Sequence, residues 1–232
     1  MPGIGLNFLL QPPVNLFPNP RKAPRHAPLA RGGDLSPAML LNAYENGIFP
    51  WYSEDSPILW WSPDPRCVMD VEHLHVSTSL TRLLRRGSFR ITWNRCFSRV
   101  MEECGSGRED GTWIFPEMVE AYSKLHHLGQ AHSIEVWSGD ALAGGLYGVQ
   151  CGAGFMAESM FHRVRDASKI ALATAIATLF AAGIRLFDVQ FLTPHLESMG
   201  AYEISRNEYL DRLEEARIIE VDLCSAFRAL PS

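Results

Sequence analysis

The strongest constraint on the fold is a run of strand, helix and strand between residues 154 and 192. GFMAESMF and LFDVQFL have the length and apolar content of strands, and the intervening DASKIALATAIATLFAAG has almost no polar face. A helix of that composition must be buried, and we expect it to begin near Asp166 or Ser168 and to end at Gly183. Strand, helix and strand connections of this kind join parallel strands by a right-handed crossover in nearly all cases. We therefore expect two parallel strands covered by this helix.

The second of these strands has two unlike faces. Alternation puts Phe187, Val189 and Phe191 on one face and Leu186, Asp188, Gln190 and Leu192 on the other. Burying a carboxylate and a carboxamide without partners would cost a few kcal/mol per group. The pair Asp188 and Gln190 therefore indicates either a functional site or a set of unseen structural partners.

The first strand carries a third polar group of the same kind. Alternation places Met156, Glu158 and Met160 on one face. If that face meets the face of Asp188, the two carboxylates share an apolar cleft. At least one pKa must then rise, or a cation must lie between them. In the alternative, each carboxylate is bound separately by a backbone group or an arginine.

Elsewhere the pattern alternates between helix and strand. Helices are predicted from Ser36 to Gly47, from Val76 to Arg85 and from Pro116 to Gly129. The first has Ser36 as a natural N-cap, and glycines end the first and the third, which both carry an apolar stripe. FRITW reads as a short strand, and SIEVW, LAGGLYGVQ and GFMAESMF form an antiparallel meander. The overall pattern is an α/β fold with a mixed (α+β) sheet.

The first part of the chain differs from the rest. Residues 1 to about 33 are rich in proline and glycine, which favours an extended arm. The proline-rich and tryptophan-rich IFPWYSEDSPILWWSPDPR follows the first helix. We place a domain border there: residues 1–62 form a small N-terminal domain with its arm, and residues 63–232 form the larger domain.

Composition excludes several classes of protein. A chain of 232 residues with 47% hydrophobic content can bury a sizeable core. No run approaches the ~20 apolar residues that cross a bilayer, and GLNFLLQPPV lacks the basic start of a secretory signal. The five cysteines form no C-x-x-C pair, and the histidines lack the spacing of a metal site. We expect a cytoplasmic protein without a membrane or metal partner.

Positive charge is concentrated in one tract, although the formal net charge is −5. Between Glu72 and Glu102 there is no acidic residue, but there are six arginines: Arg82, Arg85, Arg86, Arg90, Arg95 and Arg99. A shorter basic stretch holds Arg21, Lys22, Arg25 and Arg31. Either tract can be solvated surface or a patch that contacts phosphates.

Several long motifs resemble one known family. They are GIFPWYSEDSPILWWSPDPR, DGTWIFPEMVEAYSKLHHLGQAHSIEVW, GGLYGV, AESMF, ASK and FDVQFLTPHLESMGA. The chain closely resembles the bacterial leucyl/phenylalanyl-tRNA–protein transferases, from about GGDLSP to RNEYLDRL. The resemblance implies a small N-terminal α+β domain followed by a domain with the fold of the GCN5-related acyltransferases.

The resemblance also implies a reaction and its substrates. Leucine or phenylalanine moves from Leu-tRNA or Phe-tRNA to the N-terminal α-amine of a protein that begins with Arg or Lys, which marks that protein for N-end-rule degradation. No cofactor is implied, and we expect a monomer. Within this reaction the arginine tract, through Arg82, Arg85, Arg86 and Arg90, is expected to bind the tRNA backbone.

The family motifs assign roles to individual residues. Asp188 and Gln190 match the pair implicated in peptide-bond formation, with Gln190 polarised by Asp188, and Glu158 is expected to hold the acceptor. The aminoacyl pocket of the family matches Trp51, Trp113, Leu146, Met160, Leu172, Ala175 and Leu179. Ala175 stands where a large aromatic residue is expected, so the depth of the pocket is open.

Two other functions compete with this interpretation. A CoA-dependent N-acetyltransferase would have the same fold, but it needs a glycine-rich loop for pyrophosphate where this chain has HRVRDASK. A non-catalytic RNA-binding module would use the arginine tract. It would leave Glu158, Asp188 and Gln190 without a role.

Overall fold

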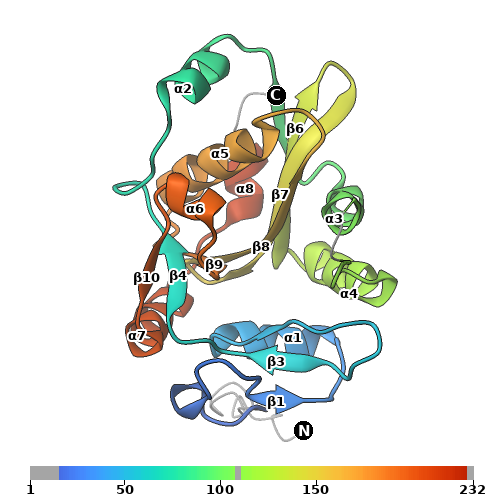
Figure 1. Ribbon diagram of the computed structural model, residues 1–232, viewed down its shortest axis with the longest axis vertical. Coiled ribbons are helices and arrows are strands. Elements are labelled where there is room, and N and C mark those ends of the chain that lie inside the picture. The colour runs from blue at the N-terminus through green and yellow to red at the C-terminus, as the bar shows by residue number, and fades with distance from the viewer. Residues whose placement is uncertain (1–15, 108–110, 229–232) are drawn as a thin grey trace, which may run out of the picture.

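The structure is a computed structural model that describes residues 16–107 and 111–228. Its main feature is a seven-stranded sheet in the order β10-β4-β9-β8-β7-β6-β5 (Figure 1). The strands are β4 (Arg66–Met69), β5 (Arg90–Trp93), β6 (Ala131–Ser138), β7 (Ala141–Cys151), β8 (Gly154–His162), β9 (Leu186–Gln190) and β10 (Tyr202–Ile204). β8 and β9 are parallel, and every other neighbouring pair is antiparallel. The sheet is mixed, as predicted.

The predicted crossover forms the centre of this sheet. α5 (Ala167–Ala181) connects β8 to β9, which pair with Met156 opposite Asp188. Nine residues of α5 are buried, which accounts for its lack of a polar face. The antiparallel meander β6-β7-β8 is also as predicted. α5 and α8 (Leu223–Arg228) lie on one side of the sheet, and α3 (Phe97–Gly105) and α4 (Pro116–His127) lie on the other (Figure 1).

A bulge in β8 changes one predicted face. Tyr147 of β7 pairs with Ser159 and Gly148 pairs with Ala157, so Glu158 is an extra residue without a partner in the ladder. The bulge reverses the alternation. Met156 belongs to one hydrophobic cluster and Met160 packs against the other. The prediction that Met156, Glu158 and Met160 share a face was therefore wrong.

The predicted helices have the expected ends. α1 (Pro37–Glu45) has Ser36 as its N-cap and Pro37 in its first turn, and α2 (Thr78–Arg85) is capped by Ser77. Four further helices were not predicted from the sequence: α3, α6 (Pro194–Ser198), α7 (Arg206–Arg217) and α8. α6 follows β9 directly and, like α1, begins with a proline after a hydroxyl N-cap, Thr193.

The N-terminal part of the chain packs on the large sheet. β1 (Ala30–Arg31), β2 (Phe49–Pro50) and β3 (Leu59–Trp61) form a three-stranded sheet in the order β1-β3-β2. Residues 1–15 of the expected arm lie outside the described residues. From residue 16 on the arm is packed: Phe17 is buried with its ring 4.9 Å from Trp60.

The expected domain border falls between the two sheets. β3 ends at Trp61 and β4 begins at Arg66. One hydrophobic cluster nevertheless contains residues of both parts, among them Trp60 and Tyr122. The division at residue 62 stays a prediction, as does the detailed likeness to the GCN5-related acyltransferases. Within residues 16–107 and 111–228, no helix is long and apolar enough to cross a membrane.

Candidate active site

A cavity of about 260 Å³ opens between β2, β8, β9 and α6. Its walls are mainly apolar, and its polar groups are few. The lining residues are Phe49, Pro50, Trp51, Trp113, Glu158, Ser159, Met160, Val189, Gln190, Phe191, Thr193, His195 and Leu196. A mostly apolar cavity with a few convergent polar groups is the usual form of a small-molecule site. Glu158 and Gln190 both reach it.

The residues expected to form the aminoacyl pocket divide into two groups. Trp51, Trp113 and Met160 line the cavity. Leu146, Leu172, Ala175 and Leu179 are at most 1% exposed and belong to the core cluster around α5. Val189 is common to that cluster and to the cavity wall. The second group therefore forms part of the core behind the wall.

Phe191 lies in the cavity wall, which the sequence did not predict. β9 ends at Gln190, whose backbone φ is +59°, so strand alternation stops there. The Phe191 ring leaves the face of Phe187 and Val189. It lies 5.4 Å from the Trp51 ring and 5.8 Å from the Phe49 ring, centroid to centroid. Trp51 and Phe191 are both exposed, which gives the cavity an aromatic rim.

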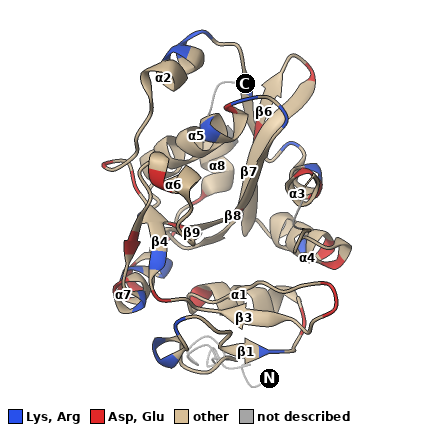
Figure 2. Cartoon of the chain, in the orientation of Figure 1, with Lys and Arg blue, Asp and Glu red and all other residues tan. Residues whose placement is uncertain are grey.

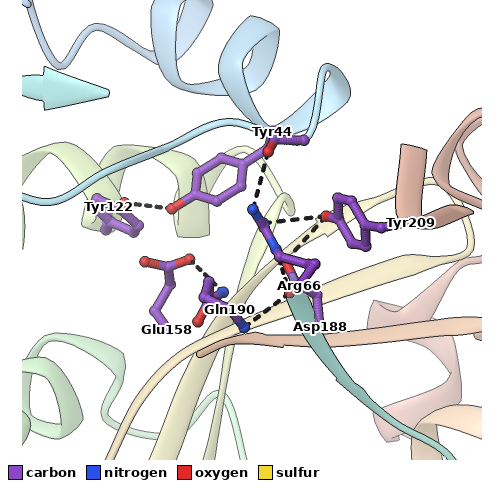
Figure 3. Close-up of polar contacts among 8 residues, drawn as sticks. Tyr44, Arg66, Tyr122, Glu158, Asp188, Gln190 and Tyr209 are labelled. Atoms are coloured by element: carbon purple, nitrogen blue, oxygen red, sulfur yellow. Dashed lines mark hydrogen bonds and ion pairs between the residues drawn. The ribbon is translucent and has the colours of Figure 1, made fainter. Parts of the chain in front are cut away.

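Asp188 is fully buried, and four donors bind its carboxylate (Figure 3). Oδ1 accepts from Arg66 Nε at 2.8 Å and from the Gln190 backbone N–H at 2.9 Å. Oδ2 accepts from Arg66 Nη2 at 2.6 Å and from the Tyr209 hydroxyl at 3.0 Å. The side-chain amide of Gln190 makes none of these bonds. The carboxylate thus contacts Gln190 through the backbone.

Arg66 is the cation that pairs with Asp188, and the sequence did not predict a role for it. It is 1% exposed, and its guanidinium lies 4.8 Å from the Phe49 ring centre and 4.4 Å from that of Tyr209. Burial lowers the pKa of Arg66, but the charge and hydrogen bonds of Asp188, together with Tyr209 and Glu158, more than offset this, so the pKa is raised overall. The only sequence signal for Arg66 was the unpaired charge predicted on β8 and β9.

Glu158 is the second carboxylate of the site. Desolvation raises its pKa to about 8, helped by the charge of Asp188 and opposed by a hydrogen bond from Tyr44 and by Arg66. Tyr44 and Tyr122 are buried with their hydroxyl oxygens 2.5 Å apart, and burial raises both of their pKa values well above 10. Both tyrosines therefore remain protonated, and a pKa of about 8 favours the neutral form of Glu158 at pH 7.

Gln190 links the two carboxylates. Its Nε2 lies 3.5 Å from Glu158 Oε1, and its backbone N–H is bound by Asp188. A left-handed backbone costs a non-glycine residue roughly 1–2 kcal/mol. Such strain persists where neighbouring contacts enforce it and often marks a functional site. Here it points the carboxamide toward the cavity.

The arginines expected to bind tRNA are exposed. Arg82 and Arg85 lie on α2, Arg86 is its C-cap, and Arg90 begins β5 with its guanidinium 5.2 Å from the Trp137 ring centre. Within the described ranges, none of the four forms an ion pair with a carboxylate. Figure 2 shows this positive charge on α2 at the far end of the molecule from β1.

Metal ligands do not gather anywhere in the described part of the chain, where no group of three His, Cys, Asp or Glu side chains has suitable geometry. His132 is an example of a structural histidine. It is buried between Asn94 and Gln150, and desolvation lowers its pKa to about 4.

Comparison with known proteins gives the family. Residues 68–214 match the family model described as leucyl/phenylalanyl-tRNA protein transferase, and residues 33–64 match the model of its N-terminal domain. The chain belongs to the leucyl/phenylalanyl-tRNA protein transferase family. The resemblance seen in the sequence is thus confirmed. Glu158, Asp188 and Gln190 fall within the larger match, and Arg66 lies between the two.

Individual relatives agree with this family. A leucyl/phenylalanyl-tRNA–protein transferase from Anaeromyxobacter sp. (strain Fw109-5) is 55% identical over 203 residues, which are 86% of each chain. One from Shigella sonnei (strain Ss046) is 52% identical over 204 residues, 87% of each chain. A solved C-terminal domain of a putative lysylphosphatidylglycerol synthetase from Agrobacterium fabrum aligns at 12% identity over 83% of this chain and 62% of its own, with a TM-score of 0.37, too low to support an argument.

Proposed function

We propose that this chain is an aminoacyltransferase that moves leucine or phenylalanine from aminoacyl-tRNA to the N-terminal α-amine of proteins. The acceptors begin with Arg or Lys, and the added residue marks them for N-end-rule degradation. Family membership supports the donor and the reaction, because the relatives are named for both. The structure supports the chemistry through one observation: an apolar cavity that has a carboxamide and a carboxyl group on its wall.

The cavity suits the end of an aminoacyl-tRNA. Met160, Val189 and Leu196 offer an apolar surface to a leucine or phenylalanine side chain. The exposed rings of Trp51 and Phe191 offer a stacking surface to the terminal adenine, as aromatic side chains do for single-stranded bases. The ester carbonyl between amino acid and ribose would then lie beside Gln190.

The transfer needs no activation of the donor. The acceptor amine attacks the ester carbonyl, a C–N bond forms, and the C–O bond to the ribose breaks. The proton lost by the amine ends on the ribose oxygen that leaves. An α-amine with a pKa near 7.7–8.0 is partly neutral at pH 7. Positioning by Gln190 therefore supplies most of the acceleration.

Glu158 is placed to select the acceptor. A cationic group next to a carboxyl group lowers its pKa and favours the charged form. The basic side chain of an Arg-initiated acceptor would therefore convert Glu158 from a neutral acid to a carboxylate that binds it. An apolar N-terminal residue would not.

The rest of the donor would extend along α2. The exposed Arg82, Arg85, Arg86 and Arg90 would contact tRNA phosphates without reading bases. Because charged tRNA is a cytoplasmic substrate, we assign the chain to the cytoplasm. We expect it to act as a monomer, since the proposed site is formed within one chain.

The competing functions explain less. In the loop where a CoA enzyme has its glycine-rich turn, this chain has Asp166 in a left-handed conformation (φ +66°) at the start of α5 and no glycine. A non-catalytic RNA-binding module would need only the arginines, so it would leave Glu158, Asp188 and Gln190 without a role.

The test is a transfer assay with radiolabelled Leu-tRNA and a protein that begins with Arg. We expect label in the protein fraction, and none when the acceptor begins with Met or has an acetylated N-terminus. Labelled acetyl-CoA in place of Leu-tRNA tests the rival donor. Label from acetyl-CoA, or no label from Leu-tRNA, would reject the proposal.

A further inference from the structure

The end of β9 is fixed by contacts from both parts of the chain. Arg66 binds Asp188 with two parallel hydrogen bonds and also donates to the carbonyl of Gly47 at 3.2 Å. Gly47 ends the α1 turn that leads into β2, whose Phe49 lines the cavity. One guanidinium therefore contacts both the segment that leads into β2 and Asp188 of β9, and Figure 3 shows the second of these contacts.

The pairing of β9 with β4 is irregular at the same place. β4 pairs Val68 with Asp188 and Cys67 with Gln190, so the register shifts and Val189 has no partner on that side. At this irregularity Gln190 has a left-handed backbone conformation, and its N–H donates a hydrogen bond to Asp188 Oδ1. The Asp188 carboxylate thus binds the backbone of the residue whose side chain lines the cavity.

Asp188 has no contact with which to polarise the carboxamide. Its four bonds go to Arg66, Tyr209 and the Gln190 backbone. Its charge faces the Arg66 guanidinium, to which the Tyr209 hydroxyl also lies close, at 3.3 Å. The nearest side-chain partner of the Gln190 amide is Glu158.

We propose that Arg66 is a positioning residue for aminoacyl transfer, and that Arg66 and Asp188 act as one unit that holds the Gln190 backbone rather than as an electronic relay to its side chain. This inference rests on the proposed function, in which Gln190 orients the attacking amine. Removing either member of the unit would release the same strained residue. The two losses should therefore not add.

The experiment compares Arg66→Gln, Asp188→Asn and the double variant in the transfer assay. We expect each single variant to lower kcat by about 10- to 1000-fold and to leave the KM values of tRNA and acceptor within about threefold, with the double variant no slower than the poorer single. A relay predicts otherwise: Arg66→Gln would leave the Asp188 charge free and kcat near its original value. That result, or losses that multiply, would overturn the inference.

Arg206→Gln is the matched control. Arg206 is also a buried arginine, but it donates to the backbone carbonyls of Ala23, Pro24 and Ser62 and not to a carboxylate of the site. We expect it to lower the melting temperature without changing kcat. If Arg66→Gln does not fold, Arg66→Lys replaces it, because a lysine keeps the charge but cannot form the two parallel bonds.

A second readout does not depend on activity. Amide hydrogen exchange of Gln190 should be at least tenfold faster in Arg66→Gln than in the parent, while the amides of β7 keep their rates. Unchanged exchange at Gln190 would overturn the inference even if kcat falls. If the parent itself transfers nothing, the proposed function fails, and the exchange result still decides whether Arg66 holds the Gln190 backbone.

Discussion

Arg66 and Asp188 form an ion pair that is at most 1% exposed and that joins β4 to β9 through bonds of 2.8 and 2.6 Å. A buried pair of this kind gives little net stability, because each charge loses its hydration. Its value lies in geometry, since two parallel bonds fix the carboxylate in orientation as well as position. The carboxylate held in this way accepts a hydrogen bond from the backbone N–H of Gln190.

Breaking this pair should cost far more than replacing it. Arg66→Met leaves the Asp188 carboxylate buried without its cation, so we expect the free energy of unfolding to fall by about 3–5 kcal/mol. The double variant Arg66→Met/Asp188→Leu has no unpaired charge and should recover part of that loss, yet remain slow in transfer. Urea unfolding measures the free energy of unfolding of both variants. A double variant less stable than Arg66→Met would contradict the expected recovery.

The central fold could be predicted because its signals are local or topological. The missing polar face of α5 required burial, and burial between two strands implied the parallel pair β8 and β9. Ser36 marked the start of α1 because its side chain binds a free N–H group of the first turn. The family motifs supplied the rest of the functional prediction.

The details of the site could not be predicted, because they arise where regular structure is interrupted. The bulge at Glu158 and the left-handed Gln190 each end an alternation that the sequence pattern assumes. Arg66 lies 122 residues before its partner Asp188. Only the need for a cation pointed to it. The core positions of Leu172 and Ala175 depend on how closely α5 packs on the sheet.

Glu158 should make acceptor binding depend on pH. Its pKa of about 8 means that the carboxylate fraction grows as the pH rises from 6.5 to 8.5. If the cationic acceptor binds the carboxylate form, the affinity of an Arg-initiated peptide should increase roughly 25-fold over that range. Titration calorimetry on the parent and on Glu158→Gln measures this, and the variant should give weaker binding with a flatter profile. Equal profiles would remove Glu158 from acceptor binding.

Stability gives an independent check on the same group. The folded pKa of Glu158 lies above its ordinary value of 4.5, so the folded state holds the proton more tightly than the unfolded state. Its stabilising contribution is therefore complete below pH 4.5 and is lost as the pH rises toward 8. The melting temperature of Glu158→Gln should fall less than that of the parent between pH 6 and 8.

The arginine tract should determine the salt dependence of tRNA binding. Each phosphate contact contributes about 0.7–0.9 to the slope of log affinity against log salt concentration. Arg85→Ala with Arg86→Ala should flatten that slope and weaken different tRNAs about equally. Arg21→Ala with Lys22→Ala removes the same charge from the other basic stretch and serves as the control. Equal slopes for the parent and the Arg85/Arg86 variant in filter binding would place the tract outside the interface.

Substitutions at Leu172 and Met160 should distinguish the role of the core from the role of the cavity wall in donor preference. Leu172 is fully buried, so Leu172→Ala should cost about 2–5 kcal/mol of stability and change the ratio of Leu to Phe transfer little. Met160 lines the cavity, so Met160→Ala should change that ratio at a smaller cost in stability. Competition between Leu-tRNA and Phe-tRNA measures the ratio. If Leu172→Ala changes it more, the cavity extends deeper in the bound state, as the family motifs imply.

Gln190 offers a test that separates its backbone from its side chain. Glycine adopts a left-handed conformation without strain, whereas alanine does not, and neither has a carboxamide. At the φ of +59° found here, Gln190→Gly should be more stable than Gln190→Ala by about 0.5–1 kcal/mol. Both should lower kcat by about 10- to 1000-fold, because the amine loses its orienting group in either case. Urea unfolding and single-turnover transfer measure the two quantities on the same samples. A Gln190→Gly variant with parental kcat would show that the backbone turn alone is needed, and the carboxamide would then have no part in the chemistry.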